Sequence, residues 1–132
     1  MSATGADKTA GAVRVLVVED DPELRELAAE LLEFLGYRTM VAASGDAALA
    51  MLRTEREIDL IFTDLVMPGR LDGLALAEKA RRLDPTVKVV FTSGYLGHAA
   101  LKQRLPARDE VFVHKPYRSR ELAAAIESAL AG

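Results

Sequence analysis

The sequence contains no cysteine and only two histidines, His98 and His114. The lack of cysteine excludes disulfide bonds, thiolate catalysis and cysteine-ligated metals. Two histidines are too few for the usual histidine-rich zinc site. A metal site in this chain would therefore depend on oxygen ligands, which suit hard cations.

The chain also lacks a long apolar run and an excess of positive charge. No apolar stretch approaches the ~20 residues that span a bilayer, and the N-terminal residues have no apolar core of the kind found in signal peptides. The net charge of −3 gives no bulk attraction to nucleic acid or to an anionic membrane. We therefore expect a cytoplasmic protein that contacts neither nucleic acid nor membrane directly.

The length of 132 residues indicates a single domain. Half of the residues are apolar and 28% are charged, which is ordinary for a globular domain. Residues 1–12 are small, polar and aperiodic, and we predict that they form a disordered leader or linker. The predicted domain covers residues 13–131.

Short apolar stretches alternate with helical patterns along the whole domain. Such alternation predicts a parallel sheet with right-handed crossovers and helices on both faces, an α/β fold of the doubly wound type. The third stretch carries Leu60, Ile61 and Phe62 in one run, as in a central strand that is covered on both sides. The predicted strands are 13–18, 37–42, 59–63, 87–91 and 111–113, and a helix follows each one, the fourth being a poorly marked helix at 98–105.

Capping residues mark the helix boundaries. Asp21, Ser44, Asp72 and Ser119 are the predicted N-caps of four of the helices. Pro22 follows the first cap at a position suited to the first helical turn, and Leu24, Leu27, Ala28, Leu31 and Leu35 then recur at helical spacing. Gly36 is the predicted end of that helix.

Polar residues follow four of the five predicted strands. Glu19 and Asp20 follow the first strand, Asp64 the third and Lys115 the fifth, while Thr92 opens the loop expected after the fourth. In an open parallel sheet, sites form outside the carboxyl ends of the strands, where the strand order reverses. We therefore expect these five residues to converge at one edge of the sheet.

The chemistry of this set indicates a pocket for a phosphoryl group. Three crowded carboxylates repel one another unless a cation is present, and magnesium is the hard cation that best suits such oxygen ligands. Lys115 would add a second positive charge, and the Thr92 hydroxyl could donate a hydrogen bond. The Asp64 carboxylate could then be the acceptor itself, forming an aspartyl phosphate.

Four motifs occur in order along the predicted domain. They are Val17-Val18-Glu19-Asp20-Asp21, Asp64-Leu65-Val66-Met67-Pro68 with Asp72-Gly73, Phe91-Thr92-Ser93-Gly94-Tyr95 and Val113-His114-Lys115-Pro116-Tyr117. With these motifs the chain resembles a receiver domain of a two-component response regulator over residues 13–131. The resemblance implies a flavodoxin-like, three-layer fold with a five-stranded sheet of order 2-1-3-4-5. The Thr-Ser-Gly-Tyr form of the strand-four loop is frequent in receivers associated with hybrid histidine kinases.

The resemblance implies a role for Asp64 as the phosphoacceptor. It would receive a phosphoryl group from a phosphohistidine on a histidine kinase or a histidine phosphotransfer protein. The implied cofactor is Mg²⁺, held by Asp20, Asp64 and the backbone carbonyl of Val66, with Glu19 acting through water. A switched surface would then bind a downstream protein.

The resemblance assigns further roles around this acceptor. Thr92 would bond the phosphoryl group and move toward it, and Phe112 stands at the position of the family's aromatic switch residue. The Lys115–Pro116 peptide bond is expected to be cis. Val66 and Gly94 occupy two positions that influence the attack of water on the phosphate, and since neither side chain can orient a water, slow dephosphorylation is expected.

Other functions remain open on the sequence. A phosphohydrolase of the haloacid dehalogenase type would need an aspartate two residues after Asp64, where this chain has Val66. A receiver-like module that never takes phosphate, or a flavin-binding protein of the same fold, fits the polar set less well. The kinase, the pathway, the output, possible homodimerisation and the question of a stand-alone regulator or part of a larger protein stay undecided.

Overall fold

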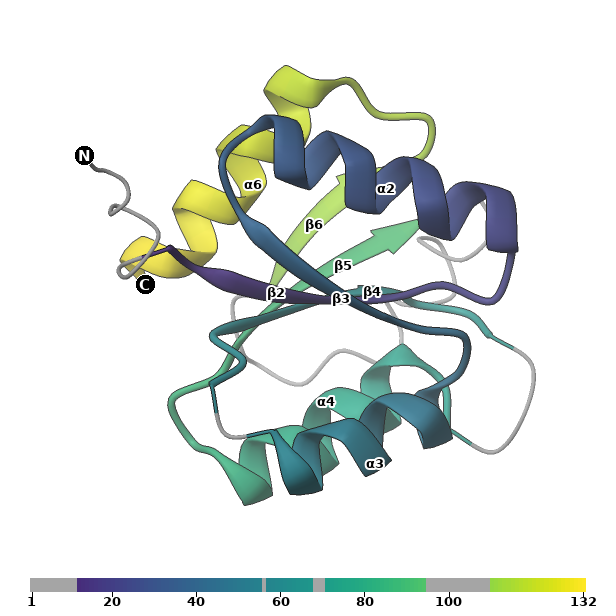
Figure 1. The fold of residues 1–132 in the computed structure, drawn as a ribbon, viewed down its shortest axis with the longest axis vertical. Helices are drawn as coiled ribbons and strands as arrows, with labels where there is room; N and C mark the ends of the chain where they lie inside the picture. The colour runs from purple at the N-terminus through teal and green to yellow at the C-terminus, as the bar shows by residue number, and fades with distance from the viewer. Residues whose placement is uncertain (1–11, 56, 68–70, 95–109) are drawn as a thin grey trace.

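A computed structural model describes residues 12–55, 57–67, 71–94 and 110–132. Nearly all of the expected leader 1–12 and the whole expected helix 98–105 lie outside this part of the chain. The described residues form a central sheet with helices on both sides (Figure 1). No helix among them is long and apolar enough to cross a membrane.

The sheet has five strands, all parallel, in the order β3-β2-β4-β5-β6. Numbered along the chain, this is the order 2-1-3-4-5, so the predicted topology is confirmed. The strand order reverses between β2 and β4. The carboxyl ends of these two strands therefore lie side by side at the point where the order changes. The strands are β2 (Arg14–Val18), β3 (Arg38–Ala42), β4 (Leu60–Asp64), β5 (Lys88–Ser93) and β6 (Val111–His114).

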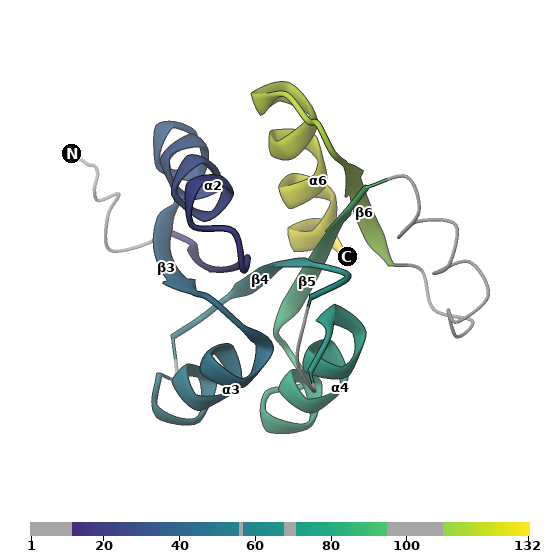
Figure 2. The ribbon, with the colours of Figure 1, turned by 90° about the vertical axis from the view of Figure 1, so that its right-hand side faces the viewer.

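Two pairs of helices cover the two faces of the sheet. Both views place α2 and α6 on one face and α3 and α4 on the other (Figures 1 and 2). Successive strand residues point to opposite sides of the sheet. Because the strands are apolar along most of their length, both faces of the sheet are apolar. The helices are α2 (Pro22–Phe34), α3 (Gly45–Thr54), α4 (Gly73–Leu83) and α6 (Ser119–Ala131).

The central strand β4 shows why both faces must be covered. Every residue from Leu60 to Asp64 is buried. Phe62 packs into the core beneath α2 and α6, whereas Ile61 packs into the core above α3 and α4. Full burial of one such side chain stabilises the fold by about 1.5–3 kcal/mol. The continuous apolar run in the sequence reflects this two-sided burial.

Side-chain caps begin three of the helices as predicted. The Asp21 carboxylate accepts hydrogen bonds from the first-turn amides of α2, Ser44 Oγ accepts one from Ala47 at 3.0 Å, and Asp72 Oδ1 accepts one from Ala75 at 2.9 Å. Each cap satisfies an amide that the helix leaves unpaired. After α2 the chain turns at Gly36, whose φ of +101° favours glycine.

Two local predictions are wrong. The N-cap of α6 is Arg118, not Ser119, because the Glu121 carboxylate accepts a hydrogen bond from the Arg118 amide at 2.8 Å and fixes the helix start one residue earlier. Thr92 and Ser93 belong to β5 and do not open a loop, since β6 pairs with them and extends the ladder.

The apolar pattern of α2 also does not coincide with its buried face. Ala28 and Leu32 are buried against the sheet, whereas Leu24 and Leu27 are exposed. The predicted helix is confirmed, but its sequence pattern spreads more leucines around the axis than the sheet can cover.

Candidate functional site

The five predicted polar residues lie at the carboxyl ends of the strands. These strand ends lie on the right-hand side of Figure 1. Glu19 and Asp20 follow β2 directly, and Asp64 is the last residue of β4. Thr92 pairs in register with Asp64 across the β4–β5 ladder. Lys115 follows β6, and its amide donates to the Ser93 carbonyl at 2.9 Å, which holds the lysine backbone against the end of β5.

Lys115 joins two carboxylates that come from different strands. Its ammonium donates to Glu19 Oε1 at 3.0 Å and to Asp64 Oδ2 at 3.1 Å. Both carboxylate side chains are largely buried, and Lys115 itself is 26% exposed. Charge-assisted hydrogen bonds of this kind are stronger than neutral ones and fix geometry. The lysine therefore ties the end of β2 to the end of β4.

Burial and charge shift the pKa values of this group. Burial raises the pKa of Asp64 above its ordinary value, and the Lys115 ammonium opposes the shift. Burial also raises the pKa of Glu19, against hydrogen bonds from the Asp21 amide and from Lys115. Burial alone would lower the pKa of Lys115, but its hydrogen bonds to the two carboxylates and their charges together raise it. The site thus carries more negative charge than its own lysine balances.

The donor set fits a divalent cation. Glu19, Asp20 and Asp64 each place a carboxylate oxygen within 4.8 Å of the others. Three carboxylates against one ammonium leave an excess of two negative charges, and two of the three carboxylates are buried. Oxygen ligands with no sulfur or imidazole suit a hard ion. A cation at this cluster would remove the repulsion that burial strengthens.

A close backbone contact fixes the position of Asp64. The Leu65 amide donates to the Thr92 carbonyl at 2.9 Å, and the Gly73 amide donates to the Leu65 carbonyl at 2.9 Å. A Cβ at position 73 would overlap the Asp64 carbonyl oxygen, so only glycine allows α4 to start this close to the strand end. Asp72 thus caps the helix, and Gly73 allows the backbone at the end of β4 to approach it closely.

The Thr92 hydroxyl has no hydrogen-bond partner within the described residues, although it is buried. A buried hydroxyl without a partner costs about 1–3 kcal/mol. It belongs to the residue paired in register with Asp64. Such orphan groups in a site are available to a ligand.

The remaining predicted residues surround this centre. Phe112 stacks on Phe91, with ring centroids 5.4 Å apart. Val66, two residues after Asp64, has an exposed side chain. A Cβ built at Gly94 would meet no atom of the described residues within 4 Å. The Lys115–Pro116 peptide bond is cis, as the resemblance implies.

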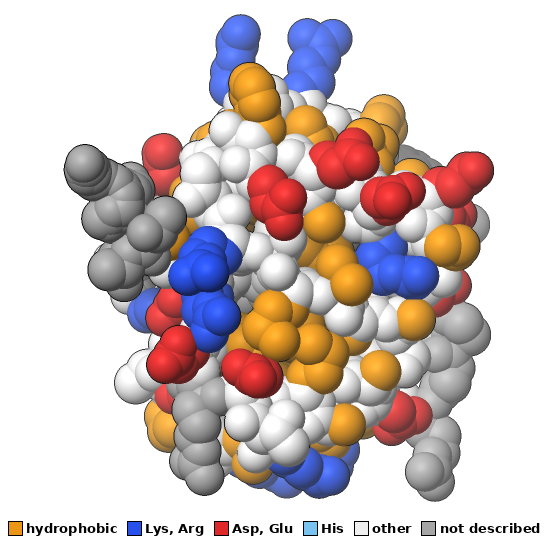
Figure 3. Space-filling view, viewed as in Figure 1, with side chains coloured by type: hydrophobic (Ala, Val, Ile, Leu, Met, Phe, Trp, Pro, Cys, Tyr) orange, Lys and Arg blue, Asp and Glu red, His pale blue; other side chains and the backbone are white. Residues whose placement is uncertain are grey.

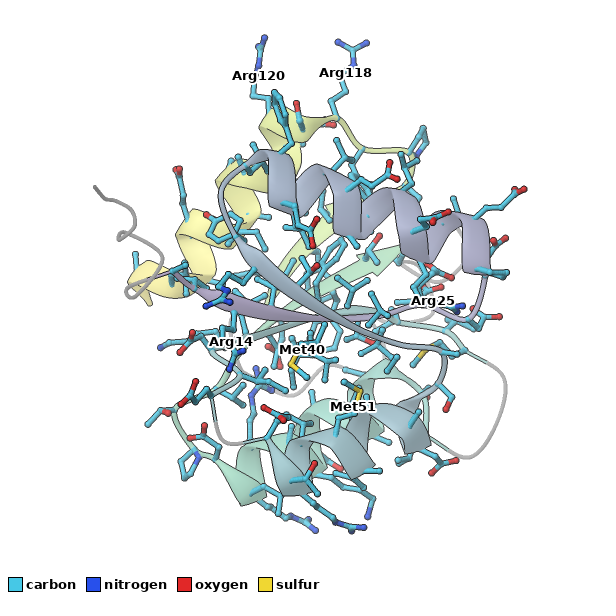
Figure 4. All side chains as sticks on the ribbon, viewed as in Figure 1. Arg14, Arg25, Met40, Met51, Arg118 and Arg120 are labelled. Carbon is cyan, nitrogen blue, oxygen red and sulfur yellow. The ribbon has the colours of Figure 1, made fainter. Side chains whose placement is uncertain are left out.

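Sequence reasoning missed two residues beside the site. Arg25 donates from Nη1 to the Glu19 carbonyl at 2.9 Å, and Figure 4 shows it reaching from α2 toward the strand ends. Tyr117 packs edge-on against Phe62, with centroids 5.8 Å apart, and burial raises its pKa. Arg25 follows the cap Asp21 by one helical turn, which was the available sequence signal. Tyr117 lies within the last motif but had no predicted task.

The comparisons with known proteins agree with this geometry. The family model for the response regulator receiver domain matches residues 15–127. The response regulator receiver protein CpdR of Brucella abortus is 34% identical over 117 residues, covering 89% of this chain and 96% of that protein. The sensor kinase CckA of the same organism is 34% identical over 127 residues, which are 95% of this chain and only 13% of the kinase.

The fold has a close counterpart among solved structures. A response regulator receiver protein from Sinorhizobium medicae WSM419 superposes with a TM-score of 0.81 and 28% identity, covering 93% of this chain and 98% of that one. The chain is thus similar in length both to a whole receiver protein and to a small part of a kinase. Since the family model spans most of the chain and includes all five converging residues, this chain belongs to the response regulator receiver domain family.

Proposed function

We propose that the chain is a phosphoacceptor module of a two-component or phosphorelay system and that Asp64 receives the phosphoryl group. The observation that carries the proposal is the bridge from Lys115 to Glu19 and Asp64. Beside it lies Thr92, in register with Asp64, whose hydroxyl has no hydrogen-bond partner among the described residues. The donor would be a phosphohistidine of a histidine kinase or a histidine phosphotransfer protein. A cytoplasmic location is part of the same proposal.

The transfer step is a substitution at phosphorus. A carboxylate oxygen of Asp64 attacks, the new O–P bond forms, and the N–P bond of the phosphohistidine breaks with its electron pair returning to the imidazole. Lys115, already 3.1 Å from Asp64 Oδ2, stabilises the charge that develops on the phosphoryl oxygens. Thr92 supplies a hydroxyl donor to the same oxygens.

We assign the cation site to Mg²⁺, with Asp20 and Asp64 as direct ligands, the Val66 carbonyl as a third, and Glu19 acting through water. The ion would neutralise charge on the acceptor and on the transferred group. Glu19, Asp20 and Asp64 provide the oxygen cluster for it. Glu19 is held by Lys115 and by the Asp21 amide at 3.2 Å, so it is oriented before any ion arrives.

The proposed module changes a binding surface and does not turn over an external substrate. A phosphoryl group on Asp64 would give the Thr92 hydroxyl an acceptor and draw it toward the site. Thr92 shares β5 with Phe91, which stacks on Phe112 of β6. A shift of Thr92 would therefore change the packing of Phe91 against Phe112. The arrangements of Phe112 with and without the phosphoryl group would differ in affinity for a downstream protein.

The test uses acetyl phosphate with Mg²⁺ and intact-mass spectrometry. We expect one added phosphoryl group on the wild type, none on Asp64→Ala, and none when a chelator removes the metal. Asp46→Ala, which changes an exposed aspartate of α3, is the matched control and should be modified like the wild type. An unmodified wild type, or an Asp64→Ala variant that gains the same mass, would refute the assignment.

A further inference from the structure

The two helices on the lower face of the sheet leave a groove between their C-terminal halves. One hollow of about 210 Å³ is lined by Leu49 and Arg53 of α3 and by Lys79, Arg82 and Leu83 of α4. A second hollow of about 360 Å³ shares Arg53 and Leu83 with the first and continues toward Glu55 and Asp84. The two hollows adjoin at these two shared residues, and we call them together the α3/α4 groove.

The α3/α4 groove is positively charged on one side although the chain is acidic overall. Arg53, Lys79 and Arg82 are exposed, and none forms an ion pair within 4.0 Å with a described residue. The neighbouring Arg81 differs, because it forms a bidentate pair with Glu110 at 2.9 and 3.1 Å. Figure 3 shows Lys and Arg side chains gathered at the lower edge of the molecule, over the α3 and α4 layer.

Helix electrostatics explain only part of this arrangement. Arg53 and Arg82 lie in the last turns of their helices, where the macrodipole favours a cation. Lys79 lies before the last turn of α4, where the macrodipole does not favour a cation. Leu83, which lines the first hollow together with the three cations, is 49% exposed, whereas Leu49 of the same hollow is buried. The groove thus combines apolar side chains with three cations that form no ion pair within 4.0 Å among the described residues.

We propose that the α3/α4 groove binds an acidic peptide segment of a partner protein, with an apolar side chain seated on Leu49 and Leu83. The partner's carboxylates would pair with Arg53, Lys79 and Arg82. At the other end, Glu55 and Asp84 would repel further acids and favour a neutral or basic residue. Asp84 is held ionised there, since hydrogen bonds from Thr86 lower its pKa. This polarity fixes the direction of the bound segment.

The shape of the groove favours a peptide over other anionic partners. A membrane surface would require cations that protrude from a flat or convex face, and nucleic acid would require a longer basic track than three residues. Enclosed small-molecule sites usually have volumes of about 300–1,000 Å³ and bury most of the ligand. An open groove with an apolar floor and a charged rim instead matches the anatomy of a protein interface.

The groove lies away from Asp64. Gly73, at the start of α4, contacts the Asp64 backbone, whereas Leu83 ends the same helix. An α-helix rises about 1.5 Å per residue, so the helix separates the two sites by roughly 15 Å. A partner held in the groove would leave the phosphoacceptor site open. The proposal is therefore independent of the phosphoryl transfer.

The test uses a short fluorescein-labelled peptide with one phenylalanine, several glutamates before it and neutral residues after it. Fluorescence anisotropy should give saturable binding to the wild type with a dissociation constant on the order of 0.1 mM, as for weak transient contacts. Amide shifts in ¹H–¹⁵N spectra of the wild type should change mainly in α3 and α4. Replacing the glutamates by glutamine, or the phenylalanine by serine, should weaken binding about tenfold or more.

Charge reversal on the protein localises the site. Arg53→Glu/Lys79→Glu/Arg82→Glu should lower the affinity at least tenfold, and Leu83→Ser should weaken it by a smaller factor. The matched control, Arg38→Glu/Arg118→Glu/Arg120→Glu, reverses three exposed arginines elsewhere and should retain binding within about twofold. Figure 4 shows Arg118 and Arg120 projecting at the opposite end of the molecule.

Several results would overturn the proposal. These are the absence of saturable binding up to about 1 mM peptide, equal losses in the groove and control variants, or shifts that map outside α3 and α4. Phosphatidylserine vesicles and a single-stranded oligonucleotide are run beside the peptide. If either binds through the groove cations while the peptide does not, the assigned partner class is wrong.

Discussion

Asp64 and Thr92 are register partners on neighbouring parallel strands, and the Thr92 hydroxyl is buried without a hydrogen-bond partner among the described residues. The ladder between β4 and β5 thus brings a carboxylate and a hydroxyl donor to the same edge of the sheet. A buried hydroxyl without a partner lowers stability, and a phosphoryl group on Asp64 would give this hydroxyl an acceptor. This relationship makes Thr92 the first residue to test.

Replacing Thr92 by valine should separate stability from signalling. Valine keeps the shape and removes the orphan hydroxyl, so the free energy of unfolding of the unphosphorylated protein should stay equal or rise by up to about 1 kcal/mol. Phosphorylation of Asp64 should still occur, but the spectral changes that it causes at Phe112 should be lost. Urea unfolding and ¹H–¹⁵N spectra with acetyl phosphate measure the two effects. Thr92→Ser retains a hydroxyl and should keep the response; a Thr92→Val variant that responds like the wild type would contradict this role.

The stability of the metal-free protein should depend on pH through Asp64. Its folded-state pKa lies above the ordinary value of 3.8, because burial raises it. The contribution of Asp64 to the free energy of unfolding is therefore fully present below pH 3.8, where the carboxyl is protonated in both states. It is lost as the pH rises through the folded-state pKa, because the buried carboxyl must then become charged. Asp64→Asn removes this loss, so the variant should have the higher melting temperature at pH 7, with a gain that shrinks as the pH falls toward 3.8.

Thermal melts in the presence of a chelator, from pH 3.5 to pH 8, measure this difference. Adding Mg²⁺ at pH 7 should raise the melting temperature of the wild type much more than that of the variant. A gain for Asp64→Asn that is equal at all pH values would show that burial of the charge is not the cause.

Removing the positive charge of Lys115 should destabilise the fold by leaving two carboxylates without their cation. Lys115→Met is expected to cost about 1–3 kcal/mol, less than for a fully buried pair because the lysine is 26% exposed. Adding Glu19→Gln removes one of the stranded charges, so the double variant should be more stable than Lys115→Met alone. Urea unfolding of the four proteins of the cycle measures the coupling. Lys79→Met, on the exposed side of α4, should change stability by less than about 0.5 kcal/mol.

The position of Asp64 could be predicted from the sequence because burial leaves few choices for its strand. The run Leu60, Ile61 and Phe62 must be covered on both faces, which places β4 in the middle of the sheet and Asp64 at its end. The alternation of strands and helices then fixes the parallel order and brings the other strand ends to the same edge. Convergence of Glu19 and Lys115 with Asp64 follows from topology alone.

Details that depend on side-chain packing were not predictable in the same way. The helix start at Arg118 depends on a hydrogen bond that its amide donates to the Glu121 carboxylate, three positions later. This bond competes with the better capping chemistry of Ser119. The extension of β5 through Ser93 depends on pairing with β6, a contact between distant parts of the chain. The orphan state of the Thr92 hydroxyl is likewise visible only once the strands are packed.

Gly73 should be intolerant of any side chain. A Cβ there would overlap the Asp64 carbonyl oxygen and approach the Leu65 backbone, which cannot move without shifting the site. Gly73→Ala is therefore expected to destabilise the protein by about 1–3 kcal/mol and to slow phosphorylation of Asp64. Gly94→Ala is the control, since no atom of the described residues lies within 4 Å of a Cβ there, and should change stability by less than about 0.5 kcal/mol. A stable Gly73→Ala variant with normal phosphorylation would show that the close approach is dispensable.

The lifetime of the phosphorylated state should depend on Val66. Its exposed side chain lies two residues after Asp64 and has no atom that could orient a water for attack on the phosphate. We expect slow loss of the phosphoryl group in the wild type and a loss about tenfold faster in Val66→Asn, whose amide can hold such a water. Val41→Asn, an exposed valine on the edge strand β3, is the matched control and should leave the rate unchanged. The decay of the phosphorylated mass after removal of acetyl phosphate gives the rates. A wild-type half-life of seconds in Mg²⁺, or equal rates for wild type and Val66→Asn, would place the control of lifetime in other residues.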